Sequence, residues 1–482
     1  MQTDINLDVK SIKRKTIGGA MSFFVRTLIL NGVGLAANLI LGGLLMVADF
    51  GIYGVVVQII GVLSFFSDIG LASALIQKKE EPTDQDYQTI FWAQMTLAGL
   101  IVGICWLIVK IGFFAQQLGE QGPAILYALA FSFVIGTMKT VPSIKLTRGL
   151  NFSKFVWPQI VEQVVFNGVL IYLVIKNMGL QAYTIAIWAR SIAGSALMMY
   201  LVPFWPKLSF SWQSFKKTIR YGCKFQANDL LARIKDQLFY LFIAKKVTLD
   251  EFGYISFAKN WSMYPYNLTV QNVMAITFPT FSRLQEHQKY LRKAIEKSIF
   301  FITLMIFPIL TGMCVFFWPL TQVITKYNKW EEALLSFVFF TLAIAPAAIS
   351  SPLTNVLNAI GKINKTLALM VFWTILTWVL TLPLLKMIGY NAVAVSAFVI
   401  SLTSFLPVII VKKTIAFNLW EQIWRQFFAS LMMAIFGLAF MGWWASNLQM
   451  TIIGGLSTGL IYVLTLLLVG KNKLILEFRS LK

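Results

Sequence analysis

Long apolar runs recur along almost the whole chain and limit the folds that it can adopt. Runs of roughly 18 or more apolar residues, each long enough to cross a bilayer as a helix, follow one another from Gly18 to Gly470. A helix satisfies its own backbone hydrogen bonds where no water is available. Of the 482 residues, 58% are hydrophobic and 13% are charged, whereas about a quarter are charged in soluble domains. We therefore predict an all-α polytopic membrane protein.

The sequence predicts 14 membrane-spanning helices, the first of them retained rather than cleaved as a signal peptide. The predicted spans are 18–47, 51–76, 86–113, 122–144, 154–176, 179–205, 215–244, 251–282, 290–320, 332–360, 364–387, 390–411, 419–445 and 449–470.

Basic residues lie mainly in alternate loops. One set of loops holds most of the lysines and arginines, from the cluster at residues 10–15 to Lys471 and Lys473, whereas the other set holds seven lysines. By the positive-inside rule, both termini are predicted to face the cytoplasm. The net charge of +21 therefore reflects topology, and we expect no nucleic-acid partner.

Few residues could support catalysis or metal binding. The cysteines Cys105, Cys223 and Cys314 lie inside apolar runs, and the single histidine, His287, lies in a charged loop. These positions argue against a catalytic triad and a histidine-bound metal site, and no nucleotide-binding loop is found. We expect no metal, no cofactor and no enzymatic activity.

A short internal echo predicts two related halves. Phe50-Gly51 recurs as Phe252-Gly253, 202 residues and six predicted helices later. An even number of helices between the copies gives a parallel repeat about the membrane normal, and transporters with such repeats bind substrate between them.

Among the charged residues within the predicted spans, ten are candidates for a buried site. A charged side chain facing lipid at a helix centre costs about 2.5–3.5 kcal/mol, so these residues should face a cavity or one another. They are Arg26, Asp68, Lys139, Glu162, Arg190, Lys224, Asp229, Arg233, Asp236 and Lys259.

The seventh predicted helix has the most polar face. Gln226, Asp229, Arg233 and Asp236 fall at helical spacing and form one stripe, which is typical of a helix that lines an aqueous cavity. A purely structural ion pair between Asp229 and Arg233 is the alternative.

The first half contains a second charged group. Arg26, Asp68, Lys139 and Glu162 lie at similar depth from the cytoplasmic helix ends, which suggests one shared cavity. Alternatively, Asp68 and Glu162 only neutralise Arg26 and Lys139. Along the chain cations outnumber acids within the spans, and arginine and lysine suit phosphate, so the predicted ligand is anionic.

Four segments resemble the polysaccharide transporters of the multidrug/oligosaccharidyl-lipid/polysaccharide exporter superfamily, the Wzx-type O-antigen, capsule and exopolysaccharide flippases. They are ADFGIYGVVVQIIGVLSFFSDIGLASALIQ (48–77), LTRGLNFSKF (146–155), EFGYISFAKNWSMYPYNLTVQNVMAITFPTFSRLQ (251–285) and SPLTNVLNAIGKINKTL (351–367).

The resemblance implies two pseudo-symmetric six-helix lobes followed by two further helices. The division is then a cytoplasmic N-terminus (1–17), an N-lobe (18–205), a cytoplasmic linker (206–214), a C-lobe (215–411), helices 13 and 14 (412–470) and a cytoplasmic tail (471–482).

It also implies a bacterial inner-membrane flippase that moves undecaprenyl-pyrophosphate-linked oligosaccharide outward through a central cationic cavity. Predicted substrate contacts are Arg26, Lys139, Arg190, Lys224, Arg233 and Lys259. Asp68, Glu162, Asp229 and Asp236 are candidates for coupling to Na⁺ or H⁺, or for charge balance. Expected partners are lipid-linked oligosaccharide, membrane lipids, and a polysaccharide polymerase or assembly proteins.

Three other functions remain open from the sequence. A multidrug antiporter of the same superfamily should have an acidic cavity for cationic drugs, and a membrane-embedded polysaccharide-processing enzyme needs acid–base groups that are scarce here. A subunit without transport of its own leaves the charged residues within the spans unexplained.

Overall fold

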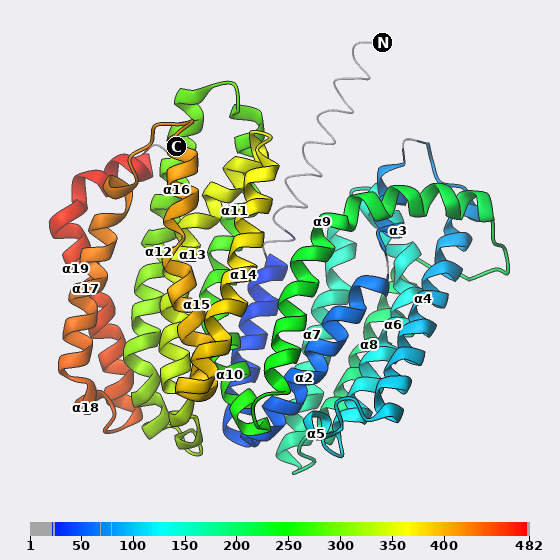
Figure 1. Ribbon diagram of the computed structural model, residues 1–482, viewed down its shortest axis with the longest axis horizontal. Helices are drawn as coiled ribbons and strands as arrows, with labels where there is room; N and C mark the ends of the chain where they lie inside the picture. Colours follow the sequence, from blue (N-terminus) through cyan, green and yellow to red (C-terminus); the bar gives the residue numbers. More distant parts are fainter. Residues whose placement is uncertain (1–21, 23–24, 68, 79, 480–482) are drawn as a thin grey trace. The chain divides into compact units, whose positions relative to one another are not determined.

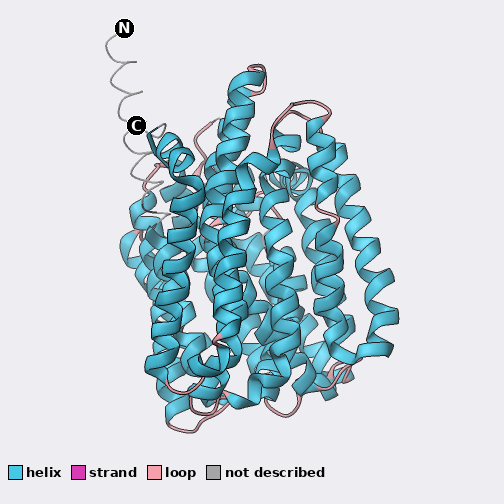
Figure 2. Cartoon of the chain, turned by 90° about the vertical axis from the view of Figure 1, so that its left-hand side faces the viewer, coloured by secondary structure: helices cyan, strands magenta, loops and turns pink. Residues whose placement is uncertain are grey.

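The computed structural model describes residues 22, 25–67, 69–78 and 80–479, with only the backbone described for 220–235 and 478. Within these residues the secondary structure is helical, and no strand occurs among them (Figure 2). The chain divides into two compact units, residues 1–252 and 253–482. The prediction of an all-α protein is confirmed.

The first unit is built from long helices joined by short turns (Figure 1). After the helix Val25–Leu44 come α2 (Val47–Ser64), η1 (Phe65–Ser67), α3 (Leu71–Gln77), α4 (Asp84–Ile111), α5 (Ala115–Leu118), α6 (Gly122–Arg148), α7 (Phe152–Ile175), α8 (Gln181–Leu201) and α9 (Trp212–Ala244). Helix α6 packs between α4 and α8, and α8 packs on α7. Helix α9 packs on α2, α3 and α4. The sequence instead predicts that this helix is the first of the C-lobe (215–411), and the boundary between the two lobes stays a prediction.

The second unit is centred on two long helices, α12 and α13. Its elements are α10 (Leu249–Leu268, beginning four residues before the boundary), α11 (Val270–Leu284), α12 (Gln288–Val323), η2 (Asn328–Ala333), α13 (Leu334–Ala359), α14 (Ile363–Ile388), η3 (Gly389–Asn391), α15 (Ala392–Leu402), α16 (Phe405–Lys412), α17 (Leu419–Ala439), α18 (Met441–Trp444) and α19 (Leu448–Arg479). The last long helices, α17 and α19, pack on each other and on α12.

Ten segments are long and apolar enough to cross a membrane, and one of them, Ile363–Lys412, holds two of the predicted spans. The described parts of the other predicted spans are helical as well. The polytopic architecture is thereby confirmed, and the number of 14 spans stays a prediction.

Four predicted spans are interrupted where the sequence predicts continuous helices, one of them, 419–445, at Phe440 between α17 and α18. The span 51–76 breaks between η1 and α3, where Ile69 and Gly70 adopt positive φ values of 46° and 78°. The span 390–411 breaks at Thr403–Ser404, because Pro407 has no N–H for the Thr403 carbonyl and its ring clashes with that group.

The span 251–282 breaks at Thr269. Both the N–H and the hydroxyl of Thr269 donate to the Pro265 carbonyl, at 3.0 and 2.6 Å. The breaks after Ser67 and after Leu268 therefore occur at nearly the same place in the two copies of the repeat.

The starts of α2 and α10 also match. Asp49 accepts a hydrogen bond from the Met46 N–H at 3.0 Å, and Glu251 accepts one from the Thr248 N–H at 2.7 Å. In both cases the carboxylate caps free N–H groups at a helix start, and each pair lies 202 residues from its counterpart. The predicted repeat thus has a counterpart in local structure.

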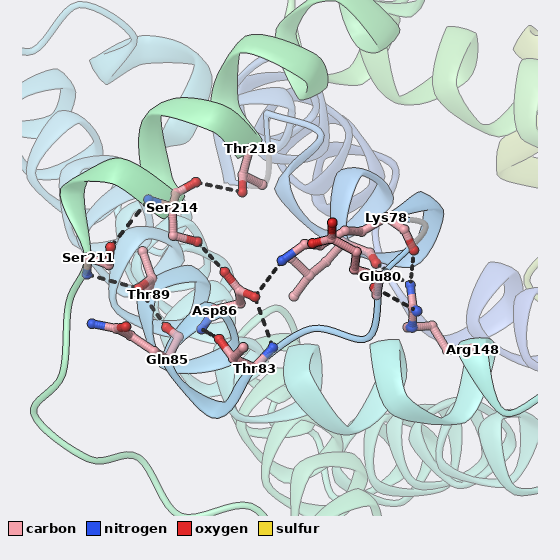
Figure 3. A network of polar contacts seen from close by, with 11 residues as sticks. Lys78, Glu80, Thr83, Gln85, Asp86, Thr89, Arg148, Ser211, Ser214 and Thr218 are labelled. Carbon is pink, nitrogen blue, oxygen red and sulfur yellow. Dashed lines mark hydrogen bonds and ion pairs between the residues drawn. The ribbon is translucent and has the colours of Figure 1, made fainter.

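Arg148, at the end of α6, hydrogen-bonds to the carbonyls at the C-terminal end of α3 (Figure 3). Its guanidinium donates to the carbonyls of Leu75, Ile76 and Lys78 at 2.8, 3.0 and 2.8 Å, and to that of Glu80 at 3.2 Å. The last carbonyls of a helix have no partner within the helix. One side chain therefore satisfies the C-terminus of α3 and fixes it to α6.

We predict that Arg148→Lys lowers the thermal unfolding midpoint by about 5 °C, because a lysine cannot donate to several carbonyls at once and charged hydrogen bonds are lost. Differential scanning fluorimetry in detergent measures the shift. Lys154→Gln, which removes an exposed charge from the following helix, is the control. An Arg148→Lys midpoint equal to that of Lys154→Gln would contradict this role.

Candidate functional site

A cavity of about 740 Å³ lies within the first unit and is the strongest candidate for a binding site. Helices α4, α6, α7 and α8 contribute most of its lining, together with Ser67 at the break after α2. Interrupted helices at matching positions of a repeat are a recurrent sign of transporter binding sites. The break in the first unit therefore lies where such a site is expected.

The charged residues among the described lining are Lys139, Glu162 and Arg190. All three come from the sequence prediction, and together they give an excess of one positive charge. The structure thus brings these three residues into one cavity, and their contact with substrate stays a prediction.

Hydroxyl and amide groups form most of the remaining polar wall. They belong to Ser67, Gln94, Ser132, Thr137, Thr140, Ser143, Thr147, Gln159 and Gln163. The sequence analysis missed them, although five are on α6 at spacings of three to five residues, which is one face of a helix. Hydroxyls at helical spacing in an otherwise apolar span were the available signal. The hydroxyls of Ser132, Thr137 and Thr147 donate to carbonyls of α6 at 2.6, 2.7 and 2.8 Å, so their oxygens remain as acceptors. The amides of Gln159 and Gln163 add both donors and acceptors for a polyhydroxylated ligand.

Lys139 and Glu162 form an ion pair between α6 and α7. Their side chains remain 26% and 24% exposed, so the pair is open to the cavity rather than sealed in the protein. Charge neutralisation, the alternative left open by the sequence, therefore applies to this pair. It leaves the carboxylate and the ammonium within reach of a ligand.

Gly194 of α8 makes room for this ion pair. A Cβ atom at position 194 would overlap the side chain of Glu162. The glycine at position 194 is therefore explained by the close approach of the Glu162 side chain to the backbone of α8, and not by an unusual backbone conformation.

Arg190 reaches the cavity from α8 and packs on an aromatic side chain. Its guanidinium lies 4.8 Å from the ring centre of Phe166, within the range of a cation–π interaction. Phe166 in turn contacts Tyr183, which stacks on Tyr53 with ring centres 4.1 Å apart. This aromatic stack holds the arginine at the cavity wall.

Arg26 lies near the cavity, on the first helix. It is half-buried and lies one turn before Leu30, which lines the cavity. Two polar residues that accompany it along the helix, Asn31 and Asn38, donate to the carbonyls of Thr27 and Gly34 at 2.9 Å. Part of the polar stripe of this helix is therefore used within the helix itself.

Of the remaining predicted residues, only Asp236 and Lys259 have described side chains, and neither belongs to the described lining of this cavity. Asp68 and the side chains of Lys224, Asp229 and Arg233 lie outside the described residues, so the structure gives no account of the stripe on α9 or of its ion pair. Lys259, half-buried on α10, belongs to the second unit.

The described end of α9 packs against its own unit. Asp236 is exposed. The side chain of Gln237 packs closely on Gly61 of α2, where an added Cβ atom would lie 2.7 Å from the Gln237 amide carbon. Farther along, the ammonium of Lys245 lies 3.2 Å from the ring centre of Phe113.

We predict that Gly194→Ala reduces thermal stability in the wild-type background and has little effect in a Glu162→Ala background. The new methyl group displaces Glu162 from Lys139 only when the carboxylate is present, so the two substitutions should not be additive. A thermal-shift double-mutant cycle measures this coupling. Gly168→Ala is the control, because its Cβ would meet open space. Equal losses in both backgrounds would contradict the packing.

Comparison with known proteins identifies relatives of this chain. Over 386 residues the chain is 22% identical to the lipopolysaccharide biosynthesis protein WzxC of Escherichia coli (strain K12), covering 76% of this chain and 74% of that protein. Over 471 residues it is 21% identical to the succinoglycan biosynthesis transport protein ExoT of Rhizobium meliloti (strain 1021), covering 90% and 89% of the two chains.

The fold is similar to that of the lipid II flippase MurJ in an inward closed conformation. The TM-score is 0.76 at 13% identity, and the match covers 94% of this chain and 99% of that one. At this identity the likeness shows the fold, and the predicted transporter architecture is confirmed by it.

Residues 40–335, more than half of the chain, match the family described as "Polysaccharide biosynthesis protein". The resemblance to polysaccharide transporters predicted from the sequence is thereby confirmed. The chain belongs to the polysaccharide biosynthesis protein family.

Proposed function

We propose that this protein is a flippase that moves a lipid-linked oligosaccharide, of the undecaprenyl-pyrophosphate type, from the cytoplasmic to the periplasmic leaflet of a bacterial inner membrane. The observation that carries the proposal is the cavity of about 740 Å³ with Lys139 and Arg190 in its wall. The family match, the relatives named for polysaccharide biosynthesis and transport, and the flippase fold support it.

The charges favour an anionic head group. Arg190 is half-buried and presents a planar guanidinium, whose geometry suits phosphate oxygens. Lys139 adds a second positive charge to the wall of the same cavity, where it is paired with Glu162. The hydroxyl and amide wall suits the sugar, whereas the lipid tail remains in the bilayer. Alternating access then carries the head group across, and the glycan leaves chemically unchanged.

The orientation follows from basic residues at one end of the first unit. Lys78, Arg148, Lys207 and the start of α9 meet there through hydrogen bonds to one another and to α4. By the positive-inside rule we assign this end to the cytoplasm, and the same rule, applied to the loops along the whole chain, predicts that both termini face the cytoplasm. The glycan would arrive from cytoplasmic synthesis and be passed on to a polymerase or assembly proteins.

A gradient of Na⁺ or H⁺ is the proposed energy source. Glu162 is the acidic residue in the cavity wall of the described chain, and a cation or proton that binds its carboxylate would free Lys139 for the substrate. A multidrug antiporter remains the competing function, and the excess positive charge of the described cavity disfavours cationic drugs.

We expect protein-dependent movement of a fluorescent undecaprenyl-pyrophosphate oligosaccharide across proteoliposomes, faster with an imposed Na⁺ or H⁺ gradient. Lys139→Gln and Arg190→Gln should each lower the rate at least about tenfold, because each removes a charged contact to the pyrophosphate. Lys154→Gln removes an equally positive but exposed side chain and should retain the wild-type rate.

Each arm of this experiment has a distinct meaning. Transport of a cationic dye without glycan movement would replace the proposal by the drug antiporter. Glycan movement that survives both cavity substitutions would keep the flippase but remove this cavity as the head-group site. Movement that is insensitive to both gradients would remove the ion coupling alone.

A further inference from the structure

The connection between α8 and α9 has no regular secondary structure, and its backbone is held by side chains of α4. The Gln88 carboxamide accepts from the Lys207 N–H at 2.8 Å and donates to the Trp205 carbonyl at 3.3 Å. The Trp92 indole donates to the Lys207 carbonyl at 2.8 Å. These side chains satisfy non-helical backbone groups and attach the connection to α4.

Helix α4 is also hydrogen-bonded to the start of α9 (Figure 3). The Ser211 N–H donates to the Thr89 hydroxyl at 3.0 Å, and the Ser214 hydroxyl donates to Asp86. Asp86 is paired with Lys78 at 2.7 Å. The polar groups of the connection are therefore directed toward α4.

Phe204 is buried against α4, whereas the large apolar side chains of residues 205–212, in the connection and at the start of α9, are directed away from the protein. Trp205, Leu208, Phe210 and Trp212 are 77%, 93%, 48% and 67% exposed. Phe210 and Trp212 also pack on each other and on Phe215, with ring centres 5.3–6.4 Å apart. Four exposed apolar side chains within residues 205–212 form an apolar patch on this segment, and leaving them in water would be unfavourable.

Lysines accompany the patch. Lys207, Lys216 and Lys217 are exposed on the same short stretch of chain. Tryptophan, other aromatic residues and lysine are the side chains enriched at the membrane–water interface, and each lysine near an anionic surface strengthens binding. A soluble partner would explain the apolar residues but not their position at the ends of the spanning helices α4, α6 and α8.

We propose that residues 205–217 form an interfacial anchor that binds the headgroup region of an anionic lipid leaflet. Trp205, Leu208, Phe210 and Trp212 insert among the headgroups, and the three lysines contact lipid phosphates. The anchor holds the connection on the membrane surface while α4 holds it on the protein. It does not depend on the transported substrate.

The test uses the full-length protein with Cys105, Cys223 and Cys314 replaced by alanine and an environment-sensitive fluorophore on Leu208→Cys. The protein is reconstituted in phosphatidylcholine vesicles with or without phosphatidylglycerol. Quenching is measured with a headgroup-nitroxide lipid and with aqueous iodide. A label on Glu286→Cys, an exposed polar position in the turn before α12, is the control for a water-exposed site.

We expect the label at position 208 to be quenched by the nitroxide lipid and protected from iodide, more strongly with phosphatidylglycerol, and the label at position 286 to show the reverse. Equal iodide quenching at both positions would overturn the anchor and favour a soluble partner on this patch. If position 208 tolerates no substitution, a label on Trp212→Cys gives the same test.

The role of charge is tested separately. Lys207→Gln, Lys216→Gln and Lys217→Gln together should abolish the effect of phosphatidylglycerol on the label. The control removes the same charge from exposed lysines elsewhere, with Lys289→Gln, Lys293→Gln and Lys365→Gln. An effect of phosphatidylglycerol that persists in the first triple variant, or disappears equally in the second, would refute anionic lipid binding at this segment.

Discussion

Every backbone polar group of this chain must find a partner without help from the lipid, and the described structure follows from that constraint. Long helices satisfy it internally. Where a helix stops inside or near the bilayer, a side chain from a neighbouring helix takes over. Arg148 does so for the end of α3, and Gln88 and Trp92 do so for the connection before α9. The polar residues of the first unit are thus divided between holding broken backbone and lining the cavity.

That division separates structural charges from candidate functional ones. Arg148 and Asp86 are occupied by several hydrogen bonds each, at one end of the unit. Lys139 and Arg190 have fewer contacts and lie in the cavity wall, one against a carboxylate and the other over an aromatic ring. A charged side chain that is held by a ring face keeps its donors available for a ligand.

The sequence predicted the features that depend on local pattern. Apolar runs predicted the helices, and the Phe-Gly repeat predicted related halves whose caps at Asp49 and Glu251 now match. Charge within apolar runs identified Lys139, Glu162 and Arg190. It did not distinguish Arg148, because the partners of this residue are carbonyls some 70 residues away along the chain. The break before Leu71 was missed because it arises from the backbone conformation at Ile69 and Gly70 inside a predicted span.

The ion pair in the cavity bears on how a transporter both binds and releases an anion. An unpaired Lys139 within the spanning region would be costly, so Glu162 stabilises the ligand-free state. In the proposed function, a pyrophosphate that enters the cavity competes with this carboxylate, which weakens binding relative to two unopposed cations. Strong binding in both orientations would slow release and hence turnover. Gly194 leaves space for Glu162 in its paired position, and in the proposed function it thereby helps to keep Lys139 neutralised when no substrate is bound.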